Sequence, residues 1–445
     1  MKNVLIKNAS LVNEDEIFVS DVLIIDNFIS RIERDIDDVN DAEIIDATGL
    51  YLFPGVIDDQ VHFREPGLTH KGEIYTEAKA AVAGGVTSYM EMPNTNPQST
   101  TVVELEKKYA RAAECSLANY SFFMGGTNTN LEEVMKVDYA KVCGLKLFMG
   151  SSTGDMLVDD KESLERIFSS VKTLIATHCE YDPLVKENQK RIVEEYGEEI
   201  PAYFHPVIRS EEACYRSSSM AVALAKKHNT RLHVLHISTA KELSLFENRT
   251  PLKEKRITAE ACIHHLWFSD EDYESKGNFI KWNPAVKTAY DRDKIFDAVL
   301  DGRIDVIATD HAPHTIEEKE QSYLKAPSGG PLIQHSLLAM LDFYKRGKIS
   351  LELIARKMSH NVADIFSIEK RGYLREGYFA DLVLVDLKQQ TPVTKQSLYY
   401  KCGWSPFEGH TFSSKVLKTF VSGKLVYDEG KFNEDNKGMR LTFSR

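Results

Sequence analysis

The middle of the chain alternates short apolar runs with longer segments whose apolar positions recur every three or four residues. A short apolar run bounded by turn residues predicts a β-strand, and the longer periodic segments predict α-helices. Eight runs follow this pattern, at residues 56–63, 88–92, 120–125, 144–149, 174–178, 231–236, 256–262 and 305–309. Helix-like segments follow at residues 74–83, 102–113, 161–171, 211–228 and 291–300. Strands that alternate with helices in this way predict an α/β protein with a TIM-like (β/α)₈ barrel.

Both ends of the chain have a different pattern, with short strands separated by Asn, Asp and Gly turns. These strands are predicted at residues 4–7, 18–25, 28–32, 42–46, 378–386, 415–421 and 424–427. Because unpaired strand edges need partners, we expect the two ends to form one small composite β-sandwich. The predicted division is therefore 1–52 and 372–445 for the β-sandwich, and 53–371 for the barrel.

Composition excludes several classes of function. The chain of 445 residues has a formal net charge of −12, which disfavours nucleic acid or an anionic membrane as a partner. No apolar run approaches the roughly 18–20 residues of a membrane span, and the first residues lack the apolar core of a signal peptide. Its six cysteines are scattered without a CxxC pair, a pattern typical of reduced, buried thiols. We therefore predict a cytoplasmic protein.

Polar side chains stand at the ends of the predicted barrel strands. They are Gln60 and His62 after the first strand, Lys146 after the fourth, His178 after the fifth, His236 after the sixth and Asp310 after the eighth. The carboxyl ends of barrel strands share one rim, so these side chains can meet there. Imidazole and carboxylate groups are ligands for Zn²⁺ and similar metals. A single histidine would more often be a buried, hydrogen-bonded one, but several strand ends together predict a metal site.

Lys146 is unusual because it ends an apolar strand, G-L-K-L-F-M-G. A buried lysine needs a partner or loses its charge. From the residues alone, two interpretations stay open. The ammonium could pair with a carboxylate or an anionic substrate, or a neutral amine could react with CO₂ to give a carbamate that bridges two cations.

Several motifs together resemble those of the amidohydrolase superfamily. They are D-x-x-x-H on the first strand, G-L-K-L-F, T-H-C-E, H-V-L-H-I-S-T, A-T-D-H-A-P-H and G-Y-L-R-E-G-Y-F-A-D-L-V-L-V-D near the end. The resemblance covers almost the whole chain. Within the superfamily, H-F-R-E-P-G-L at 62–68 and E-M-P-N-T-N-P at 91–97 look like the dihydroorotase branch of cyclic amidases.

The resemblance implies a role for each matching residue. One or two zinc ions would be held by His62, the N6-carboxylate of Lys146, His178, His236 and Asp310. The substrate carboxylate would be bound by Arg64, Asn94 and His314, and the pyrimidine ring by Asn283. Asp310 would also act as the acid and base. From the residues alone, Arg64 could instead form a salt bridge with Glu65 or Glu91.

The chain departs from the family pattern at Gln60, where relatives have a second histidine. A neutral amide is a poor zinc ligand beside imidazole. Gln60 could coordinate weakly, the metal could be held without it, or the chain could be a non-catalytic subunit. Retention of the other ligands favours a working site. The roles of Gln334 and His335 are left open, while His264 and His265 are interpreted as structural.

The resemblance thus implies a zinc hydrolase that interconverts N-carbamoyl-L-aspartate and (S)-dihydroorotate in pyrimidine biosynthesis. The alternatives are allantoinase, dihydropyrimidinase, or a non-catalytic subunit bound to aspartate transcarbamoylase. Neither alternative enzyme needs to hold a substrate carboxylate, so Arg64 and Asn94 argue against both. From general frequencies among soluble proteins we expect a homodimer.

Overall fold

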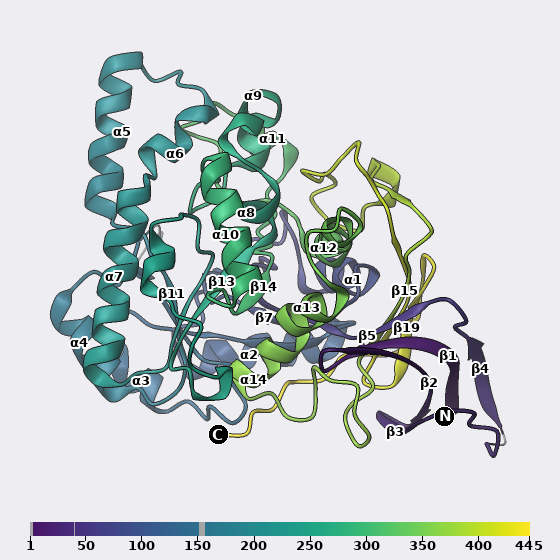
Figure 1. The fold of residues 1–445 in the computed structure, drawn as a ribbon. Helices are drawn as coiled ribbons and strands as arrows, with labels where there is room; N and C mark the ends of the chain where they lie inside the picture. The colour runs from purple at the N-terminus through teal and green to yellow at the C-terminus, as the bar shows by residue number, and fades with distance from the viewer. Residues whose placement is uncertain (1–2, 40, 151–155) are drawn as a thin grey trace.

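The computed structural model describes residues 3–39, 41–150 and 156–445, and its centre is a parallel barrel ringed by helices (Figure 1). The barrel strands follow the predicted order with ends that differ by a few residues. They are β6 (Val56–Val61), β7 (Val86–Glu91), β8 (Asn119–Phe122), β9 (Met124–Gly125), β10 (Leu145–Phe148), β11 (Ile175–His178), β12 (Leu232–Val234), β13 (Ile257–Cys262) and β14 (Val306–Ala308). The (β/α)₈ barrel is confirmed.

Two hydrogen-bonded arcs make up the barrel wall. One arc runs β6-β7-β8 and the other runs from β9 to β14, and all neighbours are parallel. β8 and β9 are two pieces of the third strand, separated by Phe123. A parallel bridge between Val61 and His311 joins the last strand to the first, where the His62 N–H donates to the His311 carbonyl over 2.7 Å. This closure brings residues after β14 beside those after β6.

The helices lie outside the barrel and cover its apolar outer face. Two of the expected helices have the predicted ends, whereas α5, the short helices before β14 and all helices after β14 were not among the predicted segments. The longer helices are α1 (Ile74–Ala83), α2 (Val102–Cys115), α4 (Lys161–Ser170), α5 (Asp182–Tyr196), α7 (Glu211–His228), α10 (Ala289–Asp301) and α12 (Ser336–Lys345). Short ones are α3 (Leu131–Met135), α6 (His205–Ile208), α8 (Ile263–Trp267), α9 (Tyr273–Lys276), α11 (Ile316–Lys319), α13 (Leu351–Ala355) and α14 (Asn361–Phe366).

Strands from both chain ends form the second unit, beside the barrel and opposite α5 and α7 (Figure 1). Its nine-stranded sheet has the order β20-β19-β18-β15-β5-β1-β2-β3, with β4 paired to β1. The strands are β1 (Asn3–Asn13), β2 (Glu16–Ile25), β3 (Phe28–Glu33), β4 (Ala42–Asp46), β5 (Tyr51–Pro54), β15 (Leu382–Asp386), β18 (Lys415–Val421), β19 (Lys424–Asp428) and β20 (Lys431–Phe432). A further short pair is β16 (Thr391–Pro392) with β17 (Thr411–Phe412).

The two chain ends meet where β5 pairs antiparallel with β15, with Leu52 opposite Leu384. Apolar residues of β1, β2, β5, β15 and β18 share one buried cluster. The composite β-sandwich is confirmed, because residues more than 300 apart in sequence build one core. The exact domain boundaries at 52/53 and 371/372 stay a prediction.

Two predictions from composition can be compared with the structure. All six cysteines are buried and free, as predicted for reduced thiols. Among the helices of the described residues, none is long and apolar enough to cross a membrane.

Candidate active site

A small cavity of about 90 Å³ opens at the carboxyl ends of the barrel strands. All but one of the predicted site residues line it, together with residues that the sequence reading did not assign. The lining residues are Gln60, His62, Arg64, Asn94, Lys146, Phe148, His178, His236, Trp282, Asn283, Asp310, Ala312, Ser328 and Gly329. His314, the exception, contacts Arg64 directly behind the lining. The strand ends therefore converge as predicted.

His62 and Asp310 meet where the barrel closes. His62 Nε2 lies 3.2 Å from Asp310 Oδ1, and His62 Nδ1 donates to Asn94 Oδ1 over 2.8 Å. Asn94 therefore orients the ring so that Nε2 faces the cavity. The Gln60 amide donates to Asp310 Oδ1 over 3.1 Å. Gln60 thus stands where the family pattern has a second histidine, but its amide donates a hydrogen bond to the Asp310 carboxylate.

His178 and His236 form the opposite side of the cavity, with 2.9 Å between His178 Nδ1 and His236 Nε2. His178 Nε2 donates to Glu180 Oε2 over 2.9 Å, and Glu180 also pairs with Arg209. Burial, with the nearby charges of His178 and Lys146, holds the pKa of His236 well below its usual value. His236 is therefore neutral, which is the form of imidazole that binds metals.

Lys146 is almost fully buried at the end of β10, and its Nζ lies 4.7 Å from the centre of the Phe148 ring. Within the described part of the chain, no carboxylate lies within 4.0 Å of Nζ and no acceptor hydrogen bonds to it. An ion pair with a carboxylate of the described residues is thus not supported, while pairing with an anionic substrate stays open. Burial lowers the pKa of Lys146 to about 8, so a larger fraction of the amine is neutral near neutral pH than in an ordinary lysine.

Arg64 lies buried at the cavity edge. Its Nε–H donates to the Pro313 carbonyl over 3.0 Å, and Nη2 lies 2.9 Å from His314 Nε2. Glu65 pairs with Arg111 at 2.7 Å and Glu91 with Lys108 at 2.8 Å, so neither carboxylate forms an ion pair with Arg64. Burial lowers the pKa of Arg64 to about 10. The cavity therefore holds a desolvated guanidinium with no contacting anion among the described residues.

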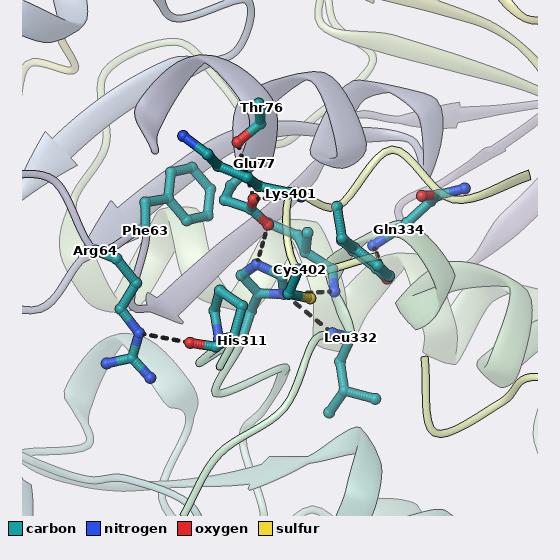
Figure 2. A network of polar contacts seen from close by, with 12 residues as sticks. Phe63, Arg64, Thr76, Glu77, His311, Leu332, Gln334, Lys401 and Cys402 are labelled. Carbon is teal, nitrogen blue, oxygen red and sulfur yellow. Dashed lines mark hydrogen bonds and ion pairs between the residues drawn. The ribbon is translucent and has the colours of Figure 1, made fainter. Parts of the chain in front are cut away.

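A polar network behind the cavity fixes the segment that carries Asp310 (Figure 2). The Leu332 N–H donates to His311 Nδ1 over 3.0 Å, so His311 carries its proton on Nε2 and donates it to Glu77 of α1 over 2.7 Å. Glu77 also accepts from the Lys401 N–H over 3.1 Å. His311 is fully buried and faces away from the cavity, so its role is to hold the loop after β14 in place.

Three cavity residues have left-handed backbone conformations. The φ angles are 71° at Arg64, 40° at His236 and 49° at Asp310. Such angles are uncommon for residues other than glycine, and they cluster at functional sites when the surrounding structure enforces them. Here each one lies two or three residues beyond the end of a barrel strand, and its side chain lines the cavity.

The Gly-rich loop after β14 forms the remaining wall through Ser328 and Gly329. Gly329 has φ +128°, and a Cβ there would lie 2.5 Å from the Ala312 carbonyl oxygen, so only glycine fits. Two buried lysines hold this loop by its carbonyls. Lys281 Nζ donates to Tyr323 and Ala326, and Lys319 Nζ donates to Pro327 at 2.9 Å and Gly329 at 2.8 Å.

The undecided residues have structural positions. The Gln334 amide bonds to the Ser397 carbonyl and the Tyr399 N–H, and His335 stacks on Phe412. His264 stacks on Trp282, and His265 contacts the Pro284 carbonyl. None of these four side chains lines the cavity. The structural interpretation of His264 and His265 agrees with this placement.

Phe148 and Trp282 line the cavity but were missed in the sequence. Phe148 follows Lys146 by two positions on the same strand, so strand alternation could have placed it on the same face. Trp282 precedes Asn283, and its Nε1–H donates to the Asp310 carbonyl over 3.2 Å. An aromatic pair in the wall limits access of water to the polar groups.

The residues present fit a divalent metal. Three neutral or neutralisable imidazoles, one carboxylate and one uncompensated lysine converge, and the buried His236 Nδ1 has no hydrogen-bond partner in the described residues. This donor set suits Zn²⁺ and related first-row metals.

Comparison with known proteins agrees with this geometry. The profile of the amidohydrolase family matches residues 51–426. The chain belongs to the amidohydrolase family. The family generally uses a divalent metal, which is consistent with the donors around the cavity. As an amidohydrolase with cyclic-amidase relatives, the protein is a cyclic amide hydrolase that acts on a small molecule.

Three relatives show where this amidohydrolase stands within the family. A dihydroorotase of Methanothermobacter thermautotrophicus is 31% identical over 401 residues, which is 89% of each chain. An L-hydantoinase of Paenarthrobacter aurescens is 30% identical over 97% of this chain and 96% of its own. The solved L-hydantoinase (dihydropyrimidinase) from Arthrobacter aurescens superposes with a TM-score of 0.93 at 27% identity, covering 99% of this chain and 100% of that one. The similarity to dihydroorotases confirms the resemblance seen in the sequence motifs.

Proposed function

We propose that this amidohydrolase is a zinc-dependent dihydroorotase, which reversibly converts N-carbamoyl-L-aspartate to (S)-dihydroorotate in pyrimidine biosynthesis. The observation that carries the proposal is Arg64, a buried guanidinium at the cavity edge with no contacting carboxylate among the described residues. A ligand with its own carboxylate would supply the missing charge. Guanidinium groups bind carboxylates through two parallel hydrogen bonds, and Arg64 has N–H groups that are not used by Pro313 or His314.

The other site residues have roles that suit this substrate. Asn94 and His314 flank Arg64 around the position for the carboxylate, and Asn283 faces the cavity with a buried Oδ1 that has no partner among the described residues. An amide oxygen in this state can accept an N–H of the pyrimidine ring. We propose these contacts as the substrate-binding set.

The proposed metal ligands are His62, Lys146 as its N6-carboxylate, His178, His236 and Asp310, holding one or two Zn²⁺ ions. When bound, zinc supplies an activated water and polarises the ring amide carbonyl. The low pKa of Lys146, caused by burial, favours the neutral amine that reacts with CO₂. The carbamate carries a negative charge into a site that otherwise has one carboxylate, and this addition suits two divalent ions.

Asp310 handles the proton in hydrolysis. Its Oδ1 faces His62 and Gln60, and its backbone carbonyl is fixed by Trp282. We propose that this carboxylate takes a proton from the attacking water and delivers it to the ring nitrogen as the amide C–N bond breaks. The same transfers in reverse close the ring of dihydroorotate.

Hydantoinase activity is the second candidate, because the L-hydantoinase similarity covers nearly the whole chain. Dihydroorotate and dihydrouracil are matched test substrates, since they differ only in the carboxylate. With zinc and bicarbonate present, we expect kcat/KM to favour dihydroorotate over dihydrouracil, hydantoin and allantoin by at least about 30-fold, the equivalent of one charge-assisted pair. Preference for hydantoin would establish the second candidate instead. No turnover of any substrate would favour a non-catalytic subunit.

The predictions of a homodimer, of an association with aspartate transcarbamoylase for a non-catalytic subunit, and of a cytoplasmic location stay predictions.

A further inference from the structure

A second group of potential ligands lies inside the barrel, outside the set that lines the cavity. Asp59 of β6, His233 of β12 and Glu260 of β13 are all fully buried, with 0% exposure. One donor atom from each lies within 4.8 Å of the others. The sequence reading assigned no role to any of them, and the proposed hydrolytic reaction does not use them.

His233 is oriented by a partner on its far side. Its Nδ1 lies 2.7 Å from Thr258 Oγ1, and the Thr258 hydroxyl donates its own hydrogen to the Leu232 carbonyl over 3.3 Å. Thr258 must therefore accept from an Nδ1–H, and Nε2 faces Asp59 and Glu260. Metal-binding histidines are commonly fixed in this way, with the other ring nitrogen donating to an outer partner.

The carboxylate oxygens that face His233 have no hydrogen-bond donors. Both oxygens of Asp59, Glu260 Oε2 and His233 Nε2 are buried without a hydrogen-bond partner in the described residues. The other oxygen of Glu260 accepts from the His236 N–H over 3.0 Å and from Cys262 Sγ over 3.2 Å. Buried carboxylate oxygens without donors are strongly unfavourable unless a cation compensates them.

The separations fit metal ligands. His233 Nε2 lies 3.1 Å from Asp59 Oδ2 and 3.7 Å from Glu260 Oε2. Nitrogen and oxygen ligands at roughly 2.0–2.2 Å from a tetrahedral Zn²⁺ lie about 3.4 Å from each other, so the two distances bracket this value. Each of the three residues supplies one donor atom, and Asp59 can bind through either of its oxygens.

The simpler alternative to a metal is protonation of the same residues. Against burial, the Asp59 and Glu260 carboxylates raise the pKa of His233 to about 9, and burial raises the pKa of Glu260 to about 7. Protons on both residues balance the charge, as does a divalent cation bound by two carboxylates and a neutral imidazole. A cation differs because it binds all three residues at one point, and their donor atoms lie within 4.8 Å of one another.

We infer that Asp59, His233 and Glu260 bind a divalent cation, with Zn²⁺ the best match to their nitrogen and oxygen donors, at a site separate from the cavity. The ion links β6 to β12 and β13, the strands that carry His62 and His236. Because its three ligands lie in the barrel interior and none lines the cavity, we assign the ion a structural role. The inference does not depend on which cyclic amide the enzyme hydrolyses.

Crystals of the holoenzyme grown with zinc test the inference without any substitution. An anomalous-difference map at the zinc edge should show a peak about 2.0–2.2 Å from His233 Nε2, Asp59 and Glu260. Peaks in the cavity serve as an internal control. A cavity peak without an interior peak would overturn the inference, as would the absence of both. An interior peak alone would support it and contradict the metal centre proposed for catalysis.

Zinc content of variants gives a second, independent measurement. Asp59→Asn should lose one zinc per chain after dialysis, and His178→Asn should keep the interior ion while losing zinc from the cavity. The matched control is Asp58→Asn, because the neighbouring Asp58 carboxylate is equally buried but accepts from Thr309 and the Gln60 N–H. Equal zinc in Asp59→Asn and Asp58→Asn would contradict the site. If Asp59→Asn does not fold, Glu260→Gln provides the same comparison.

Discussion

Two regions of the molecule bury lysines to the same extent and use them differently. At the end of α11, behind the cavity, Lys319 is 1% exposed and its Nζ donates to the carbonyls of Pro327 and Gly329, with Lys281 O at 3.4 Å. In the cavity, Lys146 is also 1% exposed, but its Nζ has no hydrogen-bond acceptor among the described residues and lies 4.7 Å from the centre of the Phe148 ring. Equal burial therefore does not imply an equal role.

The difference shows how a barrel distinguishes a structural lysine from a reactive one. Carbonyl oxygens accept hydrogen bonds from Lys319 Nζ and fix the loop through it, although burial and the nearby charges of Lys281 and Arg64 lower the pKa of Lys319 well below its usual value. Burial also lowers the pKa of Lys146, but its Nζ has no hydrogen-bond acceptor among the described residues, so its neutral amine can act as a nucleophile. The partners around each Nζ, and not the burial itself, indicate which lysine can be modified.

We expect the largest effect at Lys146. The absence of an effect there would contradict the contrast between Lys146 and Lys319. Lys146→Ala removes the proposed carbamate ligand, so we expect activity to fall by more than about 10³-fold, the equivalent of several kcal/mol of lost metal-centred stabilisation. Short carboxylic acids added to the assay should restore part of the activity. Lys319→Ala is the control, because a carboxylic acid cannot replace a donor to carbonyls. Full activity of Lys146→Ala would show that Lys146 does not bridge metal ions.

Arg64 tests whether an uncompensated cation in the cavity binds an anion. Arg64→Met should weaken binding of dihydroorotate by about 2–5 kcal/mol, because a buried charge-assisted pair is lost. The variant should turn over dihydrouracil as well as the unaltered enzyme does. Lys107→Met, which removes an exposed partner of Glu104 on α2, is the control and should leave turnover of both substrates unchanged. Unchanged kcat and KM for dihydroorotate in Arg64→Met would exclude Arg64 as the carboxylate anchor.

Lys319 has the smallest expected effect, and it sharpens the contrast. Lys319→Met leaves buried carbonyls without their donor, so the free energy of unfolding should fall by about 1–3 kcal/mol, measured by urea denaturation. KM should rise more than kcat falls, since Ser328 and Gly329 form the cavity wall. Lys325→Met, on the exposed side of the same loop, is the matched control and should be neutral. A fully stable Lys319→Met would show that the carbonyl contacts are not needed.

The sequence alone predicts those helices and site residues that follow from the periodic pattern of a single helix or strand. α1 and α7 begin and end as predicted, because apolar spacing and caps such as Ser210 define them locally. The polar residues of the first, fourth, fifth, sixth and eighth strands were brought together because parallel strands share one rim. Only the family resemblance assigned roles to Arg64, Asn94 and Asn283, because the periodicity of strands and helices does not single them out.

Long-range packing explains what the sequence reading missed. α5 carries few apolar positions, and of its residues only Val185 and Ile192 are buried, so its helical period is faint in the sequence. Asp59 and Glu260 have no local signal, because their relation depends on which strands face each other across the barrel. The absence of a carboxylate beside Arg64 likewise depends on Arg111 and Lys108, which occupy Glu65 and Glu91 from α2.

The antiparallel pairing of β5 with β15 has a consequence for synthesis of the protein. During translation, the first 54 residues leave the ribosome long before Leu382–Asp386 exist, so one edge of β5 must wait without its neighbour. The barrel segment is complete earlier and can fold while the terminal sheet still lacks its carboxy-terminal strands. Completion of the terminal sheet is therefore a late event, and ribosome-bound chains that lack these strands should expose an apolar edge that chaperones recognise.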